Sequence, residues 1–408
     1  MSKFFLSCLL VGSALLASAV GPRVAIVAAA TNTANEQTNT RFTDPRDMLV
    51  ADGRFASVTI ISTTPYGGGF TPTLFDLLNY DAILHWTNDS NANSVGLGNG
   101  FADYVDAGGG VVVSVFANTS LNVNRYLGGR WLTGGYEIIP SAGGHTEAIT
   151  GGTATEGFVH MAAPLVPSHP IFTGVGDVRL IWKTTTQGLR WGAHRPSSTN
   201  LKSWATKLAL WDDGRTAVAA HNSFPNRIDL GMHPVSDLVA AAYYDHTSDG
   251  GKLIANALLY SAGAALDTSL TLNDTVTPFA SPRTISYAVK QGLATLKTGT
   301  VSVGARPAAP TIYVRRSATG PATIEFDGSS FLKRVVAVTL TGNDIDLGPI
   351  SMTNGDVDNS GEVDAADIDA VIAAFGSTTT GITDVDVTGE VDAADIDIVI
   401  ANFGSVDD

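Results

Sequence analysis

The sequence predicts a chain of three folded parts: a doubly wound α/β domain over residues 22–265, a small all-β sandwich over 266–350, and an α-helical module with paired acidic loops over 354–408. Three observations predict this arrangement. Short apolar runs alternate with helical runs in the first part, β-rich runs separated by turn residues fill the second, and one acidic segment occurs twice in the third. A length of 408 residues also leaves room for several domain cores.

Residues 1–19 have the features of a secretory signal peptide. Lys3 gives the segment a positive start, residues 4–17 form an apolar run, and small residues at 17–19 form a cleavage site. The sequence therefore predicts a secreted, bacterial-type protein whose mature chain begins at Val20. A retained membrane helix is the alternative, but the run is short. No later segment reaches about 18 consecutive apolar residues, so no membrane insertion is expected.

The first part contains strand-like runs that are continuously apolar rather than alternating. This pattern is typical of parallel strands that are buried on both faces. Right-handed βαβ connections then give an open parallel sheet with helices on both sides. The runs that carry this prediction are RVAIVAAA (23–30), PRDMLVADGRF (45–55), VTIIST (58–63), TPTLFDLLNY (71–80), DAILHWTN (81–88), FADYVDAGG (101–109), GVVVSVFA (110–117) and KLIANALLYSAG (252–263).

The second part has many short β-type runs, which Gly, Pro, Asn and Asp separate at fairly regular intervals. We expect a small antiparallel sandwich. Because no binding motif stands out, we interpret it as a spacer, with carbohydrate binding left open. The runs are SLTLN (269–273), TISYAV (284–289), ATLKTGTVSV (294–303), TIYVRR (311–316), ATIEF (322–326) and VVAVTLT (335–341).

The acidity of the chain is concentrated in the third part. The formal net charge of the chain is −15. Residues 354–408 contain twelve Asp, two Glu and no Lys or Arg, which gives −12 − 2 = −14. A polyanionic segment disfavours nucleic acid and anionic membranes as partners and favours a cation.

The spacing within the acidic repeat indicates calcium as that cation. DVDNSGEVDAADIDAVIAAFG begins at Asp356, and DVDVTGEVDAADIDIVIANFG begins at Asp384. Oxygen-bearing side chains fall at loop positions one, three, five, nine and twelve, with glycine at six, as in a twelve-residue calcium loop. The predicted ligands for two calcium ions are Asp356, Asp358, Ser360, the Glu362 carbonyl, Asp364 through water and Asp367 in the first loop, and Asp384, Asp386, Thr388, the Glu390 carbonyl, Asp392 and Asp395 in the second.

An amphipathic helix is expected after each loop. A disordered acidic tail would not keep apolar residues at the same helical offsets in both repeats. Neither helix can bury its apolar stripe alone, so the two are expected to pair and bury both. The stripes are Ile368, Val371, Ile372 and Phe375 in one repeat, and Ile396, Val399, Ile400 and Phe403 in the other.

Two EF-hand-like loops in tandem, each with aspartate at position twelve and each followed by a single helix, resemble the type I dockerin family. The resemblance implies docking to a cohesin module on a scaffolding or cell-surface protein. It also implies that loop positions ten and eleven help to select the partner. Identical pairs in the two repeats would permit two equivalent binding orientations. Those positions are Ala365, Ala366, Ala393 and Ala394.

The third part departs from the dockerin pattern at two places. Position five holds Ser360 and Thr388, where Asn or Asp is usual, and this removes charge from the loops. The recognition pair is Ala-Ala rather than the commoner Ser-Thr, or alanine with a bulkier apolar residue. The loop substitutions are expected to weaken calcium affinity, and the alanine pairs leave the identity of the cohesin open.

The first part resembles the class I glutamine-amidotransferase-like superfamily, and within it the trehalose-utilisation (ThuA-like) branch. The resemblance rests on YDAILHWTN, FADYVDAGGGVVVSVFA, SHPIFTGVG, RIDLGMHP and DGGKLIANALLYSAG, and it implies a flavodoxin-like or amidotransferase-like sheet. Amidotransferases of this fold use a cysteine after a central strand, where this chain has VFANTS. The only cysteine, Cys8, lies in the predicted signal peptide, so thiol amidotransferase activity is excluded. A G-x-S-x-G serine elbow is absent as well.

No catalytic residue of the first part can be assigned from spacing. Polar candidates at expected strand ends and loops are His85 and Trp86, His145 with Glu147, His233, and Asp245 with His246. They could form a metal or acid–base site, although no H-x-x-x-H spacing supports one. A sugar-stacking platform is a further hypothesis, built from Trp131, Trp191 and Trp204.

Two functions therefore remain open at the level of sequence. In the first, a secreted calcium-binding protein docks to a cohesin and displays an α/β domain without a nucleophile, which binds a carbohydrate or another ligand. In the second, the chain is a secreted carbohydrate-active hydrolase that acts on polysaccharide. The missing thiol favours the first, whereas the usual cargo of dockerins favours the second. In both, the location is extracellular, or at the cell surface through the partner.

Overall fold

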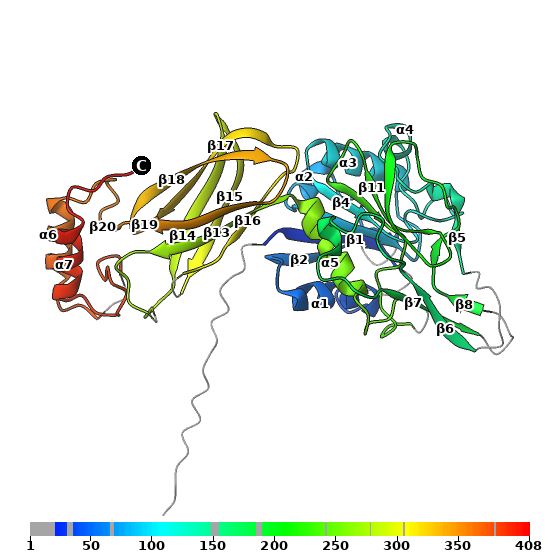
Figure 1. The fold of residues 1–408 in the computed structure, drawn as a ribbon, viewed down its shortest axis with the longest axis horizontal. Coiled ribbons are helices and arrows are strands. Elements are labelled where there is room, and N and C mark those ends of the chain that lie inside the picture. The colour runs from blue at the N-terminus through cyan, green and yellow to red at the C-terminus, as the bar shows by residue number, and fades with distance from the viewer. Residues whose placement is uncertain are drawn as a thin grey trace, which may run out of the picture.

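The computed structural model describes residues 21–30, 36–65, 69–147, 155–184, 190–240, 243–277, 279–304, 307–378 and 381–408, and the predicted signal peptide lies outside these ranges. The molecule is elongated, with an α/β domain at one end, a β-rich part in the middle and a helix pair at the other end (Figure 1). Several sheets with helices confirm a multidomain chain. None of the helices in the described ranges has the length and hydropathy of a membrane-spanning segment.

A seven-stranded sheet forms the centre of the α/β domain. Five neighbouring strands are parallel, and two further strands, β10 and β11, are antiparallel at one edge, which the prediction of a parallel sheet missed. Only short turns join these last strands, and a short turn can connect antiparallel but not parallel neighbours. The order is β10 (Ala205–Leu210), β11 (Thr216–His221), β12 (Arg227–Leu230), β4 (Gly110–Val113), β3 (Ala82–Thr87), β1 (Arg23–Ala29) and β2 (Ser57–Ser62).

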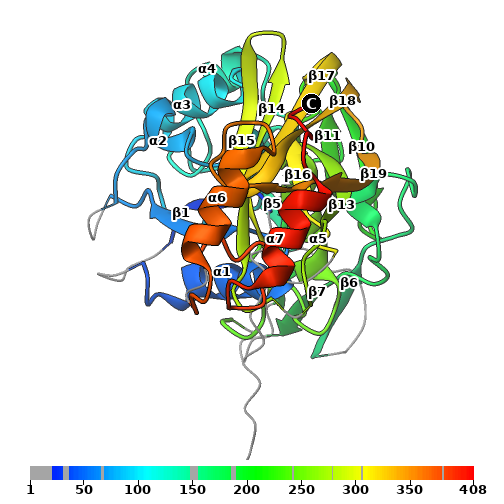
Figure 2. The same cartoon turned by 90° about the vertical axis from the view of Figure 1, so that its left-hand side faces the viewer.

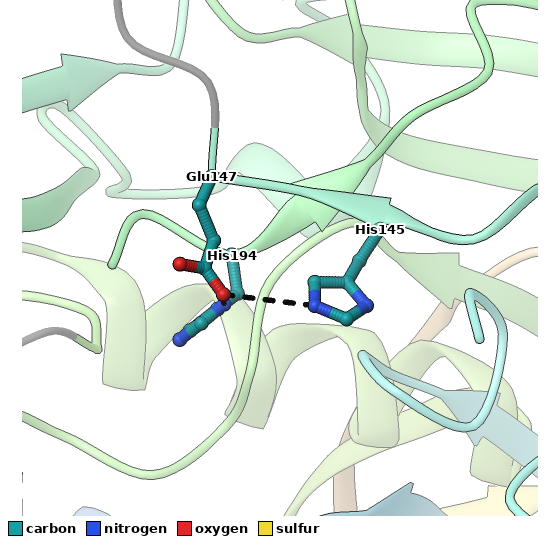
Figure 3. A group of neighbouring side chains, drawn as sticks. All are labelled: His145, Glu147 and His194. Carbon is teal, nitrogen blue, oxygen red and sulfur yellow. Dashed lines mark ion pairs between the residues drawn. The ribbon is translucent and has the colours of Figure 1, made fainter. Parts of the chain in front are cut away.

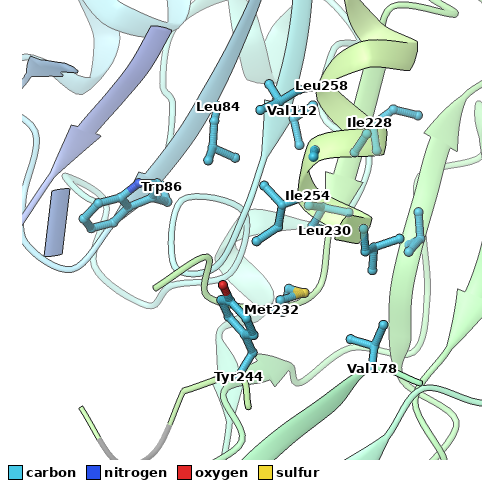
Figure 4. Close-up of a cluster of buried hydrophobic side chains, with 14 of the residues drawn as sticks. Leu84, Trp86, Val112, Val178, Ile228, Leu230, Met232, Tyr244, Ile254 and Leu258 are labelled. Carbon is cyan, nitrogen blue, oxygen red and sulfur yellow. The ribbon is translucent and has the colours of Figure 1, made fainter. Parts of the chain in front are cut away.

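Helices cover both faces of this sheet, as predicted for a doubly wound domain. On one face, α1 (Thr40–Asp52) and α5 (Gly250–Ala262) pack over a core that also contains Leu84 and Trp86 of β3. Figure 4 shows Ile254 and Leu258 of α5 projecting toward the sheet side chains of this core. The helices of the other face are α2 (Leu74–Leu77), α3 (Ser94–Asp106) and α4 (Arg130–Thr133).

Short strands and turns outside the main sheet were not predicted. A three-stranded antiparallel sheet is separate from it, and a two-strand ladder pairs His145 with Pro196 and Thr146 with Arg195. Three of these strands have only two or three residues, too few for a period-2 pattern. They are β6 (Glu156–His160), β7 (Arg179–Thr184), β8 (Arg190–Gly192), β5 (His145–Thr146) and β9 (Arg195–Pro196), with 3₁₀ turns η1 (Ser141–Gly143) and η2 (Pro170–Phe172).

The β-rich part consists of two sheets that share one apolar core. One is mixed rather than antiparallel, because β13 and β19 run parallel. The strands also extend beyond residues 266–350, since β13 begins directly after α5 and β20 contains Asp356 of the first acidic loop. The sheets are β16 (Thr311–Val314), β13 (Ala264–Leu272) and β19 (Ile345–Met352); and β15 (Ala294–Val303), β14 (Arg283–Gln291), β17 (Thr319–Gly328), β18 (Ser330–Thr341) and β20 (Asn354–Asp356).

Two helices, α6 (Ala365–Ala374) and α7 (Ala393–Ala401), follow the two acidic loops and lie side by side (Figures 1 and 2). Val371 and Val399 are fully buried between the two repeats and Leu332 of β18. The expectation that pairing buries both apolar stripes is wrong for half of the stripe residues. The side chains that stay 53–57% exposed are Ile372, Phe375, Ile400 and Phe403.

Candidate functional site

Each acidic loop brings three carboxylates together. Asp356, Asp358 and Asp367 each offer an oxygen, and these atoms all lie within 4.8 Å of one another. The second loop repeats the arrangement with Asp384, Asp386 and Asp395. The structure thus assembles loop positions one, three and twelve, which the sequence predicted as calcium ligands.

Backbone hydrogen bonds hold the carboxylate at position twelve in place. Asp367 Oδ1 accepts from the N–H groups of Val357 at 2.7 Å and Asp358 at 3.0 Å, and its Oδ2 accepts from Asp364 N–H at 2.8 Å. In the second loop Asp395 makes the same three bonds at 2.6, 3.0 and 2.8 Å. A carboxylate that lies 0% exposed and accepts three N–H bonds is fixed in orientation before any ion arrives.

A sharp turn at position six carries the chain around the carboxylate at position one. Gly361 and Gly389 have φ values of 86° and 103°, a region that glycine enters without steric cost. Their N–H groups donate to Asp356 and Asp384 at 3.1 Å. The glycines are therefore needed for the loop to close.

The aspartate at position nine has a second role that competes with ion binding. Asp364 and Asp392 cap the first turns of α6 and α7, where each accepts from an N–H two residues later at 2.7 Å. A capping box with the position-twelve aspartate completes each helix start. Neither capping residue belongs to the carboxylate clusters, so a water-mediated contact to an ion remains a prediction.

The loops are electrostatically suited to a cation. Burial raises the pKa of Asp356, Asp384 and Asp395, and neighbouring carboxylates raise it further. Asp384 Oδ1 is buried without a hydrogen-bond partner, which costs about 1–3 kcal/mol for a polar atom. A divalent ion would satisfy this atom and offset the repulsion, so the donor set fits calcium.

The predicted partner-contact residues lie on the surface. Ala365, Ala366, Ala393 and Ala394 are all exposed at the starts of α6 and α7.

The predicted ligands at loop positions five and seven lie next to each other in the first loop. The Ser360 hydroxyl donates to the Glu362 carbonyl, and the two oxygens are 3.1 Å apart. Both oxygens were predicted as calcium ligands, so the hydroxyl proton would have to turn away before both could face an ion. The corresponding positions of the second loop are Thr388 and Glu390.

His85 and Trp86 do not follow a strand, contrary to the sequence interpretation. Both lie within β3 and are fully buried. His85 Nδ1 lies 2.6 Å from the Val27 carbonyl, and burial lowers the pKa of the ring to about 4. These side chains are part of the domain core.

Trp131 does not fit a sugar-stacking platform with the other two tryptophans. It is buried, and its ring stacks on Tyr136 at 5.8 Å between centroids. Trp204 donates its indole N–H to the Glu137 carbonyl at 2.8 Å, and Trp191 alone of the three is exposed. The platform hypothesis is wrong because its first member does not reach the surface.

Asp245 and His246 form a cluster with Asp237, but the cluster is held by internal bonds. Asp245 pairs with Arg179 at 2.7 Å and accepts from the Thr247 hydroxyl at 2.7 Å. His246 Nδ1 lies 2.8 Å from Asp237. These partners occupy the oxygens of Asp245, and the cluster links the loop after β12 to β7.

His145 and Glu147 lie together with His194, which the sequence interpretation missed (Figure 3). The ladder between β5 and β9 brings these distant segments side by side, since His194 immediately precedes β9. No motif joins the three positions in the sequence, so only the fold could reveal the cluster. His233, another candidate, does not belong to the cluster, although the ring of Phe116 contacts it as well as His145 and His194.

The comparisons with known proteins show weak structural similarities. No protein-family model matches the chain, and no curated protein matches it. A type II cohesin–X-dockerin complex from Acetivibrio cellulolyticus aligns with 35% of this chain and 97% of its own, at 21% identity and a TM-score of 0.29. ThuA-like proteins from Bacteroides uniformis and Parabacteroides merdae align with 59% of this chain, and with 92% and 90% of their own. Their identities are 13% and 14%, and their TM-scores are 0.36 and 0.38.

Proposed function

We propose that residues 354–408 bind two calcium ions and dock the protein to a cohesin-type module of a scaffold or surface partner. On this proposal the chain is secreted and displays a ThuA-like α/β domain that lacks the cysteine nucleophile and binds a carbohydrate or another ligand. The duplicated carboxylate clusters carry the proposal. An acidic tail without a ligand would have no reason to bring three carboxylates together at the same positions twice.

The loop backbone also supports an ion-binding role. Val387, at position four of the second loop, has a φ of 65°, which is unfavourable for a β-branched residue. Strain of this kind persists where the surrounding structure over-determines the conformation, and it concentrates at ligand-binding loops. The ions would be held by the position-one, position-three and position-twelve carboxylates, with the Glu362 and Glu390 carbonyls and the position-five hydroxyls completing the oxygen set.

A calorimetric titration of the full-length protein with calcium tests the first half of the proposal. We expect two sites per chain in the native protein and none in the Asp356→Ala, Asp384→Ala double variant, because each substitution removes a ligand from one cluster. The Asp369→Ala, Asp397→Ala variant is the matched control. It removes the same charge from equivalent, exposed positions of α6 and α7, and should keep both sites. Absence of binding at millimolar calcium in the native protein would refute the proposal.

Docking is expected to use the exposed, duplicated surface of the helix pair. The surface carries the four alanines together with the exposed Ile372, Phe375, Ile400 and Phe403. Exposed apolar side chains gathered on a small module are typical of a protein-binding surface. Because the two repeats present the same groups, either could face the partner.

The duplication predicts how substitutions combine. Against cohesin modules of types I and II, measured by calorimetry in excess calcium, Ala366→Arg and Ala394→Arg alone should each leave binding within about threefold of the native affinity. Together they should weaken it by about 100-fold or more, since both orientations then bury an unpaired charge. An unchanged calcium titration shows that the double variant is folded. Complete loss from one single variant would exclude two equivalent orientations.

One observation favours the alternative function, a carbohydrate-active enzyme: the cluster of His145, Glu147 and His194 in the α/β domain. Its chemistry is independent of the acidic loops.

A further inference from the structure

Two imidazoles and one carboxylate converge beyond the carboxyl ends of two parallel strands of the α/β domain. Phe116 lies just after β4, and its ring contacts the rings of His145 and His194 at 4.5 and 5.0 Å between centroids. The same ring contacts His233, which follows β12, at 5.4 Å. In open α/β sheets, ligands bind in the crevice outside the carboxyl ends of the strands. The cluster therefore lies in the region where open α/β sheets bind their ligands.

The distances within the cluster match those around one small metal ion. Glu147 Oε1 lies 3.2 Å from His194 Nδ1 and 3.7 Å from His145 Nε2. Tetrahedral zinc, with bonds of about 2.0–2.1 Å to nitrogen and oxygen, separates its ligand atoms by about 3.3 Å. Figure 3 shows the two histidines approaching the Glu147 carboxylate from different sides.

One ring nitrogen of His194 has no hydrogen-bond partner among the described residues and could bind a metal ion. Its side chain is only 5% exposed, and its Nδ1 is buried with no hydrogen bond of acceptable geometry despite the nearby carboxylate. An unsatisfied buried polar atom costs about 1–3 kcal/mol, and a bound cation would remove that cost. His145 and Glu147, each with a side chain 29% exposed, leave a path from solvent to the cluster.

Glu147 supplies the one carboxylate of the cluster. It faces the nitrogens of His145 and His194, which bind a metal in their unprotonated form.

We propose that His145, Glu147 and His194 bind one divalent transition-metal ion of the zinc type, with the remaining coordination position open to water or a ligand. Imidazole nitrogens select such ions, whereas the all-oxygen loops of residues 354–408 suit calcium. Two histidines and a glutamate with one open position is the ligand number of catalytic rather than structural zinc. The site lies outside the acidic module, so it stands whether or not that module binds calcium.

A zinc titration of the full-length protein in saturating calcium tests the site, because calcium then occupies the acidic loops. With a chromophoric chelator as competitor, we expect one zinc ion per chain. His194→Ala and Glu147→Gln should each weaken binding by about 100-fold or more, since even changes to second-shell partners cost 10–100-fold. Cobalt provides a spectroscopic readout. Its visible absorption should show four- or five-coordinate geometry in the native protein and lose that signature in both variants.

His246→Ala is the matched control, because it removes a histidine from the other His/Asp cluster of the same domain. It should bind zinc with native affinity. Tryptophan fluorescence and thermal unfolding identify any variant that fails to fold, and Glu147→Gln, which keeps the side-chain volume, replaces His194→Ala in that case. Native protein that takes up no zinc, or a His246→Ala variant that loses it as fully as Glu147→Gln, overturns the proposal.

Discussion

Chelation of calcium is expected to unfold residues 354–408 in the full-length protein while the α/β domain stays folded. Without ions, each loop holds three carboxylates within 4.8 Å of one another, and their repulsion opposes the folded geometry. An ion that binds only the folded state stabilises it by about 4 kcal/mol per site at 1,000 times its Kd. That is a large fraction of the stability of a module whose core is built around a few valines, such as Val371 and Val399.

Hydrogen–deuterium exchange with and without EGTA measures this effect directly. We expect the amides of α6 and α7 to lose protection in EGTA. All six tryptophans lie between residues 86 and 211, so their fluorescence reports on the α/β domain and should not change. The Asp369→Ala, Asp397→Ala variant should respond as the native protein does. Equal protection of both helices in the two solutions would show that folding of the module does not depend on calcium.

The same repulsion gives the metal-free module a pH dependence of unusual sign. Burial, and then like charges, raise the pKa of Asp356, Asp384 and Asp395 above the usual value of 3.8. A carboxyl whose pKa is higher in the folded state stabilises that state at low pH, and this contribution is lost as the pH rises through the folded pKa. In calcium-free buffer a larger fraction of the module should therefore be folded at about pH 4 than at neutral pH, whereas in calcium the order should reverse because protons compete with the ion. Circular dichroism of the two helices follows both pH dependences.

Replacement of Asp229 by alanine is expected to destabilise the α/β domain by about 3–5 kcal/mol, because it leaves a buried guanidinium without its counter-charge. Asp229 is 0% exposed and pairs with Arg227, which is 1% exposed. Its other oxygen accepts from the Ile139 N–H at 2.9 Å. Burial raises the pKa of Asp229 and lowers that of Arg227, so each charge depends on the other.

Urea unfolding followed by tryptophan fluorescence measures this change. Asp47→Ala is the control, since it removes an ion pair of 2.7 Å to Arg46 at a largely exposed carboxylate, and such pairs contribute about 0–1 kcal/mol. An Arg227→Met, Asp229→Leu double variant should recover much of the loss, because apolar groups of similar volume often replace a buried ion pair without cost. A loss from Asp229→Ala no larger than that from Asp47→Ala would contradict this role.

The sequence predicted those parts of the fold that are set by local patterns. Continuous apolar runs correctly predicted β1, β2 and β3, and the helical spacing of residues 252–263 predicted α5. The antiparallel edge of the sheet was missed because strand direction depends on connections rather than on composition. The parallel pairing of β13 with β19 was missed for the same reason, since strands distant in sequence meet there.

The two candidate sites differ in how far the sequence could predict them. The acidic loops are contiguous, so their spacing alone placed Asp356, Asp358 and Asp367 around one point. The histidine cluster depends on the ladder between β5 and β9, which brings His145 to His194 across a long stretch of chain. Spacing along the sequence does not indicate that residues so far apart in the chain come into contact.

The attachment of the first acidic loop to the β-rich part has a mechanical consequence. Asp356 and Asn354 belong to β20, which pairs with Ser330 and Phe331 of β18. The chain end returns to the same strand, where Asp407 accepts from the Lys333 N–H at 2.7 Å and Asp408 pairs with Arg334. A pulling force applied through the helix pair would thus be divided between two anchor points on one strand. Such a tether resists peeling better than a single flexible linker, because both anchors must break before the helix pair separates from β18.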